Sequence, residues 1–195
     1  MFFGVDYYPE QWVFPYAGTA DNPEGAWERD AELMSKAGFN VVRLGEFSWG
    51  ICEPEEGKYD FLWLRRVMDI MAGYNIKVVL GTPTAAPPLW LAKKHPEILP
   101  LDESGLVKHA GTRHAVCFNN DVFWNRSKHL VENMAQALGD HSQLIAWQID
   151  SGLGAHQTEC SFNEDSRLEW QNWLKLKYET VERLNDLLGL RHWGQ

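Results

Sequence analysis

Polar and charged side chains gather at the carboxyl-terminal ends of four apolar segments of the sequence. Carboxylates in such positions can act as general acids, bases or nucleophiles, and an arginine offers a planar fork of N–H donors. The side chains concerned are Asp6, Arg43, Glu46, Thr82, Thr84, Gln148, Asp150 and Ser151. They indicate a functional site, provided that the fold brings the four segment ends together.

The apolar segments have the pattern of strands in a buried parallel sheet. They are short, nearly continuous and rich in β-branched or aromatic residues, over residues 3–8, 40–47, 77–83 and 144–150. A helical pattern follows each strand, as with Trp27, Ala31 and Met34, which lie on one helix face and precede Gly38. The chain is therefore predicted to repeat a βα unit four times in one domain over residues 1–195, with a long insertion at about 84–118.

Four βα units allow either an open doubly wound sheet or about half of an eight-stranded (β/α) barrel. A nucleotide-binding open sheet usually has a glycine-rich turn after its first strand. Here the first strand is followed by residues 6–10, DYYPE, which cannot cradle a phosphate. We therefore expect the α/β barrel type, with a site at the carboxyl ends of the strands.

The composition of the chain argues against nucleic acid and membranes as partners. Eighteen Lys and Arg against 27 Asp and Glu give a net charge of −9, which opposes binding to nucleic acid. The apolar runs fall far short of the roughly 20 residues of a membrane span, and the first residues lack a basic leader. We expect a cytoplasmic protein without disulfides. Ten tryptophans could provide platforms for sugar rings, although most are expected in packing.

Six stretches of the sequence resemble the family-42 glycoside hydrolases, which are β-galactosidases. They are residues 4–12, 40–47, 53–57, 80–88, 95–100 and 146–150. The resemblance covers nearly the whole chain and implies a TIM barrel whose catalytic acid and nucleophile follow strands 4 and 7. Because the family's catalytic barrel is about twice this long, the chain is expected to be its N-terminal half.

The sequence departs from the family where the acid should be. After strand 4 the family has Asn-Glu, where this chain has Ser151 and Gly152. A retaining glycosidase needs two carboxyl groups about 5–5.5 Å apart. By resemblance, the nucleophile would lie beyond Gln195. We therefore expect hydrolysis to be absent or very weak, and neither Glu46 nor Asp150 matches the family's acid.

Sugar binding could remain without hydrolysis. The resemblance assigns Arg113 and Trp193 to substrate contact, places Ser151 at the position of the family's asparagine, and has Arg43 and Glu46 supporting the pocket floor. For Arg43 and Glu46, a purely structural ion pair is the alternative. The ligand implied is a β-galactoside or a related sugar.

The resemblance also implies a zinc site in many family members, formed by one cysteine and a later Cys-x-Cys-x-x-Cys run. This chain retains Cys117 and Cys160 but has Phe162 and Asp165 at the other two positions, with His156 as a further candidate ligand. A structural zinc site needs four ligands, usually Cys or His. We therefore expect free thiols and no cofactor.

Two other functions stay open. Ser151 beside Asp150, with His114 or His156, would suggest a serine esterase, but the glycine that begins a Gly-x-Ser-x-Gly turn is missing. Alternatively, the chain is a non-catalytic half barrel that depends on assembly. Half a barrel leaves two open strand edges, so a homodimer that closes eight strands is expected.

Overall fold

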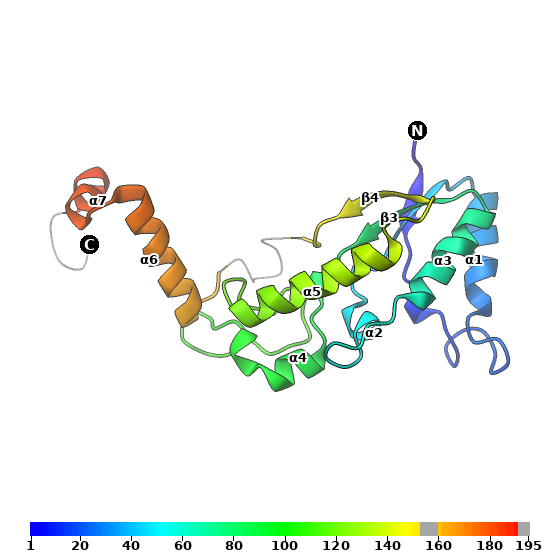
Figure 1. Cartoon of the computed structure of the whole chain (residues 1–195), viewed down its shortest axis with the longest axis horizontal. Helices are drawn as coiled ribbons and strands as arrows, with labels where there is room; N and C mark the ends of the chain where they lie inside the picture. Colours follow the sequence, from blue (N-terminus) through cyan, green and yellow to red (C-terminus); the bar gives the residue numbers. More distant parts are fainter. Residues whose placement is uncertain (153–159, 191–195) are drawn as a thin grey trace.

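The sheet has the strand order of a barrel. The computed structural model describes residues 1–152 and 160–190. Within them lie four parallel strands, β1 (Gly4–Asp6), β2 (Val41–Leu44), β3 (Lys77–Gly81) and β4 (Leu144–Gln148), in the order β1-β2-β3-β4 (Figure 1). A doubly wound sheet reverses its strand order at a switch point, whereas a barrel adds each strand beside the preceding one. The predicted fold class is confirmed.

Three helices cover one face of the sheet (Figure 1): α1 (Gly25–Lys36), α3 (Leu62–Gly73) and α5 (Asp121–Leu138). Each buries an apolar stripe, as the sequence pattern predicts. At the start of α5, the Asn120 side chain accepts hydrogen bonds from the backbone N–H groups of Val122 and Phe123, which fixes where this helix begins.

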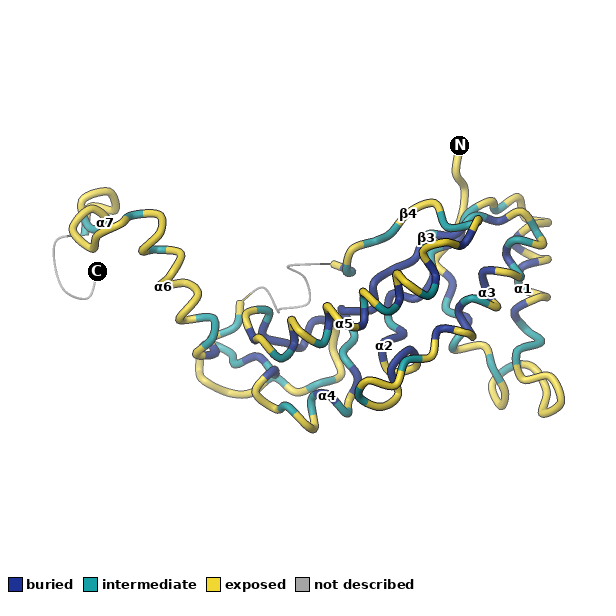
Figure 2. The backbone as a smooth tube through the Cα atoms, viewed as in Figure 1, coloured by how far each residue is buried: buried dark blue, intermediate teal, exposed yellow. Residues whose placement is uncertain are grey.

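The core lies between these helices and the two central strands, as the dark segments of Figure 2 show. Its largest fully buried side chains include Trp27, Trp49, Leu64, Met68 and Leu80. The indole N–H of Trp27 donates to the Pro9 carbonyl oxygen at 2.8 Å, so this ring also anchors the loop after β1. Packing and hydrogen bonding therefore connect the helix layer directly to the strand ends.

The two outer strands differ from the expectation that all strands are buried on both faces. All three residues of β1 are exposed, and in β4 Ile145 is exposed, as is Ile149 just beyond it. The reason is geometric, because each outer strand has a neighbouring strand on one side only. Both sheet edges present apolar side chains at the surface.

The connections contain further short helices. They are η1 (Pro9–Gln11), α2 (Trp49–Cys52), η2 (Pro83–Ala85), α4 (Leu89–Lys94) and η3 (Pro96–Ile98). Three of them lie in or at the start of the insertion expected at about 84–118. This insertion also holds an antiparallel bridge between Leu101 and Val107. It places Arg113 and His114 beside the ends of the strands.

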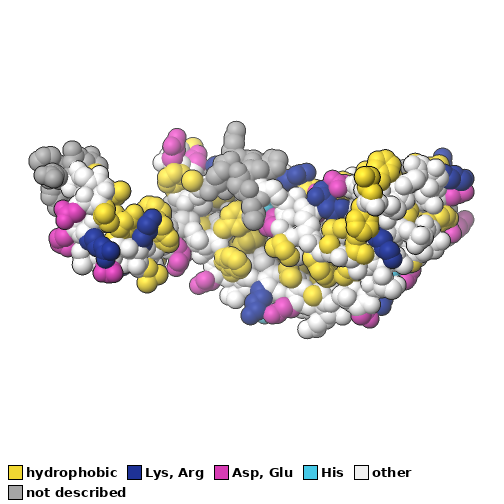
Figure 3. All heavy atoms as spheres, turned by 90° about the horizontal axis from the view of Figure 1, so that it is seen from above, with side chains coloured by type: hydrophobic (Ala, Val, Ile, Leu, Met, Phe, Trp, Pro, Cys, Tyr) yellow, Lys and Arg dark blue, Asp and Glu magenta, His cyan; other side chains and the backbone are white. Residues whose placement is uncertain are grey.

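Two further helices, α6 (Glu164–Tyr178) and α7 (Val181–Leu188), lead away from the sheet (Figure 1). Thr180 caps α7, because its side chain accepts a hydrogen bond from the Arg183 N–H. Neither helix contains a buried residue, and Figure 3 shows apolar side chains on the surface of this α6–α7 arm.

In the described part of the chain, no helix is both long and apolar enough to cross a membrane.

Glu10 offers a test of the packing below the strand ends. Burial, with a contribution from the nearby charge of Glu46, raises the pKa of Glu10 above its ordinary value of 4.5. The folded state therefore binds this proton more tightly than the unfolded state, and stability falls as pH rises through the raised pKa. We expect Glu10→Gln to raise the melting temperature by a few degrees at pH 7 and to have little effect near pH 4. Thermal melts of Glu10→Gln and of the exposed control Glu103→Gln would check this; equal shifts at both pH values would contradict it.

Candidate functional site

A chain of charged contacts joins the ends of β1 and β2. Parallel register places Asp6 beside Arg43, and the two side chains form an ion pair at 2.6 Å. Arg43 also contacts Glu46 at 2.8 Å, and the Tyr8 hydroxyl donates to the other Glu46 oxygen at 3.0 Å. Glu46 is only 2% exposed. Its carboxylate is thus buried and held in place by Arg43 and Tyr8.

The end of β3 packs directly against Glu46. A Cβ atom at position 81 would lie 2.8 Å from the Cβ of Glu46, so only glycine allows this approach. The pKa of the Tyr8 hydroxyl is raised, first by burial and then by its hydrogen bond to Glu46. Tyr8 consequently stays protonated at neutral pH and can serve as a hydrogen-bond donor.

Arg113 lies at a cavity of about 630 Å³ on the same side of the molecule. The cavity is lined by Tyr8, Gln11, Phe47, Ala86, Pro87, Leu89, Gly111, Thr112 and Arg113. The Arg113 guanidinium lies over the Phe47 ring, 4.3 Å from its centroid. Phe47 in turn stacks on Tyr8, with a centroid distance of 5.8 Å and an interplanar angle of 22°. Aromatic faces and a planar donor fork together suit a polar ligand with an apolar side.

Asp150 is tied into the structure beyond β4. One carboxylate oxygen contacts His114 Nε2 at 2.6 Å, and the other accepts a hydrogen bond from the Thr84 hydroxyl at 2.9 Å. The Asp150 N–H donates to the Thr82 hydroxyl oxygen at 2.8 Å. Both Asp150 and His114 have left-handed backbones, with φ of 58° and 54°. This network costs backbone strain but fixes the point where the chain leaves the sheet.

The next two residues occupy the positions that the resemblance assigns to the family's asparagine and to its acid. Ser151 is buried, whereas Gly152 is exposed and has a φ of +75°. A glutamate at position 152 would be strained in this conformation. The structure therefore places Gly152 at the carboxyl end of β4 with no carboxyl group of its own. Trp193 and His156 lie outside the described residues.

Within the described residues, the geometry does not couple the Ser151 hydroxyl group to His114. His114 is fully buried and directs Nε2 towards Asp150, while its Nδ1 has no hydrogen-bond partner among residues 1–152 and 160–190. Ser151 contacts Asp150 through its backbone N–H and not through its hydroxyl group. A nucleophilic serine would need its hydroxyl hydrogen-bonded to the second histidine nitrogen.

The described residues of the zinc site that the resemblance implies do not form a set of metal ligands. Cys117 is buried with its sulfur 3.3 Å from the Ser166 hydroxyl, and Asp165 accepts a hydrogen bond from the Asn120 side chain at 2.8 Å. Cys160 and Phe162 are exposed. Among the described residues, no three His, Cys, Asp or Glu side chains are grouped to hold a metal ion. Hydrogen bonds fasten the start of α6 where the resemblance implied zinc.

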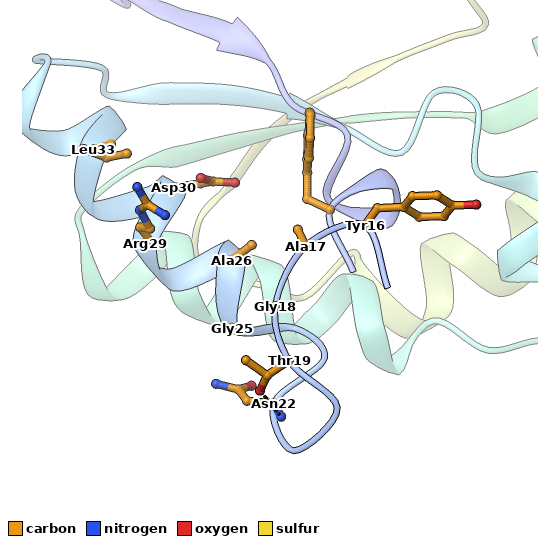
Figure 4. A pocket seen from close by; sticks show the side chains of 11 residues that line it. Tyr16, Ala17, Gly18, Thr19, Asn22, Gly25, Ala26, Arg29, Asp30 and Leu33 are labelled. Carbon is orange, nitrogen blue, oxygen red and sulfur yellow. Dashed lines mark hydrogen bonds between the residues drawn. The ribbon is translucent and has the colours of Figure 1, made fainter. Parts of the chain in front are cut away.

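Two larger cavities were not expected from the sequence. One, of about 880 Å³, lies along α1 and the loop before it, and Figure 4 shows Arg29 and Asp30 of α1 on one side and Ala17 of that loop on the other. The other, of about 910 Å³, lies between Asn119, Phe162 and the start of α6. Neither cavity is lined by a residue directly at the carboxyl end of one of the four strands. The strand-end cavity beside Arg113 therefore remains the candidate site.

The sheet order, the one-sided helix layer and the polar strand ends together define a protein of the (β/α)-barrel type. The glycoside hydrolase family 42 profile, described as Beta-galactosidase, matches residues 6–195. The chain belongs to this family.

Known relatives are β-galactosidases that are much longer than this chain. A β-galactosidase of Geobacillus kaustophilus is 39% identical over 193 residues, which are 99% of this chain and 27% of that protein. The crystal structure of a β-galactosidase from Marinomonas ef1 matches with a TM-score of 0.89 and 38% identity, over 99% of this chain and 28% of that one. The Halorubrum lacusprofundi β-galactosidase structure also matches with a TM-score of 0.89, at 35% identity, over 100% of this chain and 28% of its own. The chain thus spans about a quarter of the length of these relatives.

Proposed function

We propose that residues 1–195 bind a β-galactoside in the cavity beside Arg113 and do not hydrolyse it. The observation that carries this proposal is the Arg113 guanidinium, which lies over Phe47 with its N–H groups available at a cavity with apolar walls. Sugars combine apolar ring faces with hydroxyl groups, so they match such a lining. Family membership supports a galactoside as the sugar.

The surroundings of the carboxylates near the strand ends support the proposed absence of hydrolysis. A retaining mechanism requires one carboxyl group to protonate the leaving oxygen and a second to attack the anomeric carbon, about 5–5.5 Å apart. Position 152 carries a glycine. Glu46 is buried against Arg43 and Tyr8, and both oxygens of Asp150 are engaged by His114 and Thr84. Neither carboxylate is free to serve as the acid or the nucleophile.

Calorimetric titration with galactose tests the binding part of the proposal. We expect saturable binding of galactose to the 195-residue chain and weaker binding of glucose, which differs from galactose in the orientation of one hydroxyl group. No heat of binding for either sugar, at protein concentrations of several hundred micromolar, would refute the proposal.

We also propose that two copies of the chain associate. The support is the pair of open edges, where Val5 of β1, Ile145 of β4 and Ile149 just beyond β4 are exposed; exposed sheet edges are commonly covered or paired. Pairing β1 of one copy with β4 of the other would close eight strands. Sedimentation velocity at micromolar concentrations should show a dimer, and a monomer that persists across the concentration range would contradict this prediction.

A cytoplasmic location completes the proposal. Its support is that Cys52, Cys117 and Cys160 are free thiols, as is usual in a reducing compartment. Recovery of the protein outside the cytoplasm on cell fractionation would contradict it.

A further inference from the structure

Arg113 has few constraints apart from one aromatic ring. Its side chain is exposed and, within residues 1–152 and 160–190, it forms no hydrogen bond or ion pair. A free arginine side chain populates many rotamers, and a ligand must pay for ordering it. The contact with Phe47 is therefore the feature that can hold the guanidinium ready for a ligand.

Phe47 is itself held in place from below. Its ring is half-buried and stacks on Tyr8. The Tyr8 hydroxyl donates to Glu46, which is buried and paired with Arg43. A series of direct contacts thus runs from the charged groups at the strand ends, through two rings, to the guanidinium.

We propose that Phe47 is a positioning residue for Arg113 and so sets the affinity of the cavity for sugar. A guanidinium lying over a ring face is attracted by the electron density of that face and keeps its N–H donors free at its edge. Those donors can then hydrogen-bond to neighbouring sugar hydroxyls without a further search of rotamers. The affinity part of this inference rests on the proposed galactoside binding, whereas the positioning part does not.

Two variants separate the aromatic contact from simple bulk. Phe47→Leu keeps an apolar side chain but removes the ring, and Phe47→Tyr restores the ring. In the wild type, NMR should show the Arg113 Nε–H signal displaced by the ring current. We expect Phe47→Leu to abolish this displacement and Phe47→Tyr to retain it, while Phe162→Leu, at an exposed ring that lines a different cavity, leaves the signal unchanged.

Galactose titration supplies the second measurement. Phe47→Leu should weaken binding about 3- to 10-fold, the effect expected of a cation–π contact of this kind. In an Arg113→Ala background, the same change should have little further effect, because the two residues act as a unit.

The outcomes distinguish the two proposals. An Arg113 signal that is unaffected in Phe47→Leu, or equal losses of affinity in both backgrounds, would overturn the positioning role. Loss of the ring-current shift without galactose binding in any variant would support positioning and refute the proposed function. Retention of fold and affinity in Phe47→Tyr guards against general unfolding as the cause.

Discussion

Arg113→Ala is expected to lower the affinity for galactose by about 10- to 100-fold. Hydrogen bonds from a charged donor contribute about 1.5–3 kcal/mol each, and among the described residues the guanidinium is the charged group that lines the cavity. The substitution removes these donors and leaves the Phe47 ring in place. Calorimetry on the wild type and the variant would measure the ratio of the two dissociation constants.

The matched control for this prediction is Arg183→Ala. Arg183 is an exposed arginine of α7, paired with Glu179 at 3.0 Å and far along the sequence from the cavity. The same loss of charge there should leave galactose affinity unchanged. Equal affinities for wild type and Arg113→Ala, or an equal loss in the control, would show that Arg113 does not contact the sugar.

Trp27→Ala is expected to cost the most stability. The ring is 1% exposed, packs 6.5 Å from Trp63 between centroids and donates to the Pro9 carbonyl oxygen. Truncating a buried tryptophan costs about 3–5 kcal/mol, and here it also leaves a carbonyl group without its donor. In a chain of this size the melting temperature should fall by roughly 10 °C or more.

Trp124→Ala provides the comparison for Trp27. Trp124 lies on α5 and is 60% exposed, so its truncation should change stability by less than about 0.5 kcal/mol. Thermal melts followed by circular dichroism would compare the two variants. Similar shifts in both would mean that Trp27 is not the anchor between α1 and the loop after β1.

Most of the fold could be predicted because the spacing of apolar residues along each segment indicates a helix or a strand. The stripe of Leu64, Val67, Met68 and Met71 predicts one helix face, and all four residues are buried in α3. A period shows that a face is apolar but not what covers it. Trp170 and Trp173 have helical spacing in α6, yet no residue of that helix is buried.

The site was only partly predictable, because a sequence pattern indicates local neighbours but not which loops meet. Arg43 lies near the end of β2 and Glu46 follows three residues later, so their proximity follows from spacing, and the contact of Arg43 with Asp6 follows from parallel register. The contact between His114 and Asp150 depends on the left-handed backbone conformation of both residues, which no sequence pattern predicts. The contact between Phe47 and Arg113 joins two loops, and no local pattern specifies it.

The most direct test of the account is the rate at which the purified 195-residue chain releases p-nitrophenol from p-nitrophenyl β-galactoside. Without an available pair of carboxyl groups, we predict no release above the uncatalysed rate, for the wild type and equally for Glu46→Gln and Asp150→Asn. Steady turnover by the wild type that either substitution abolishes would contradict the account, because it would show that a buried carboxylate of the strand ends performs the chemistry.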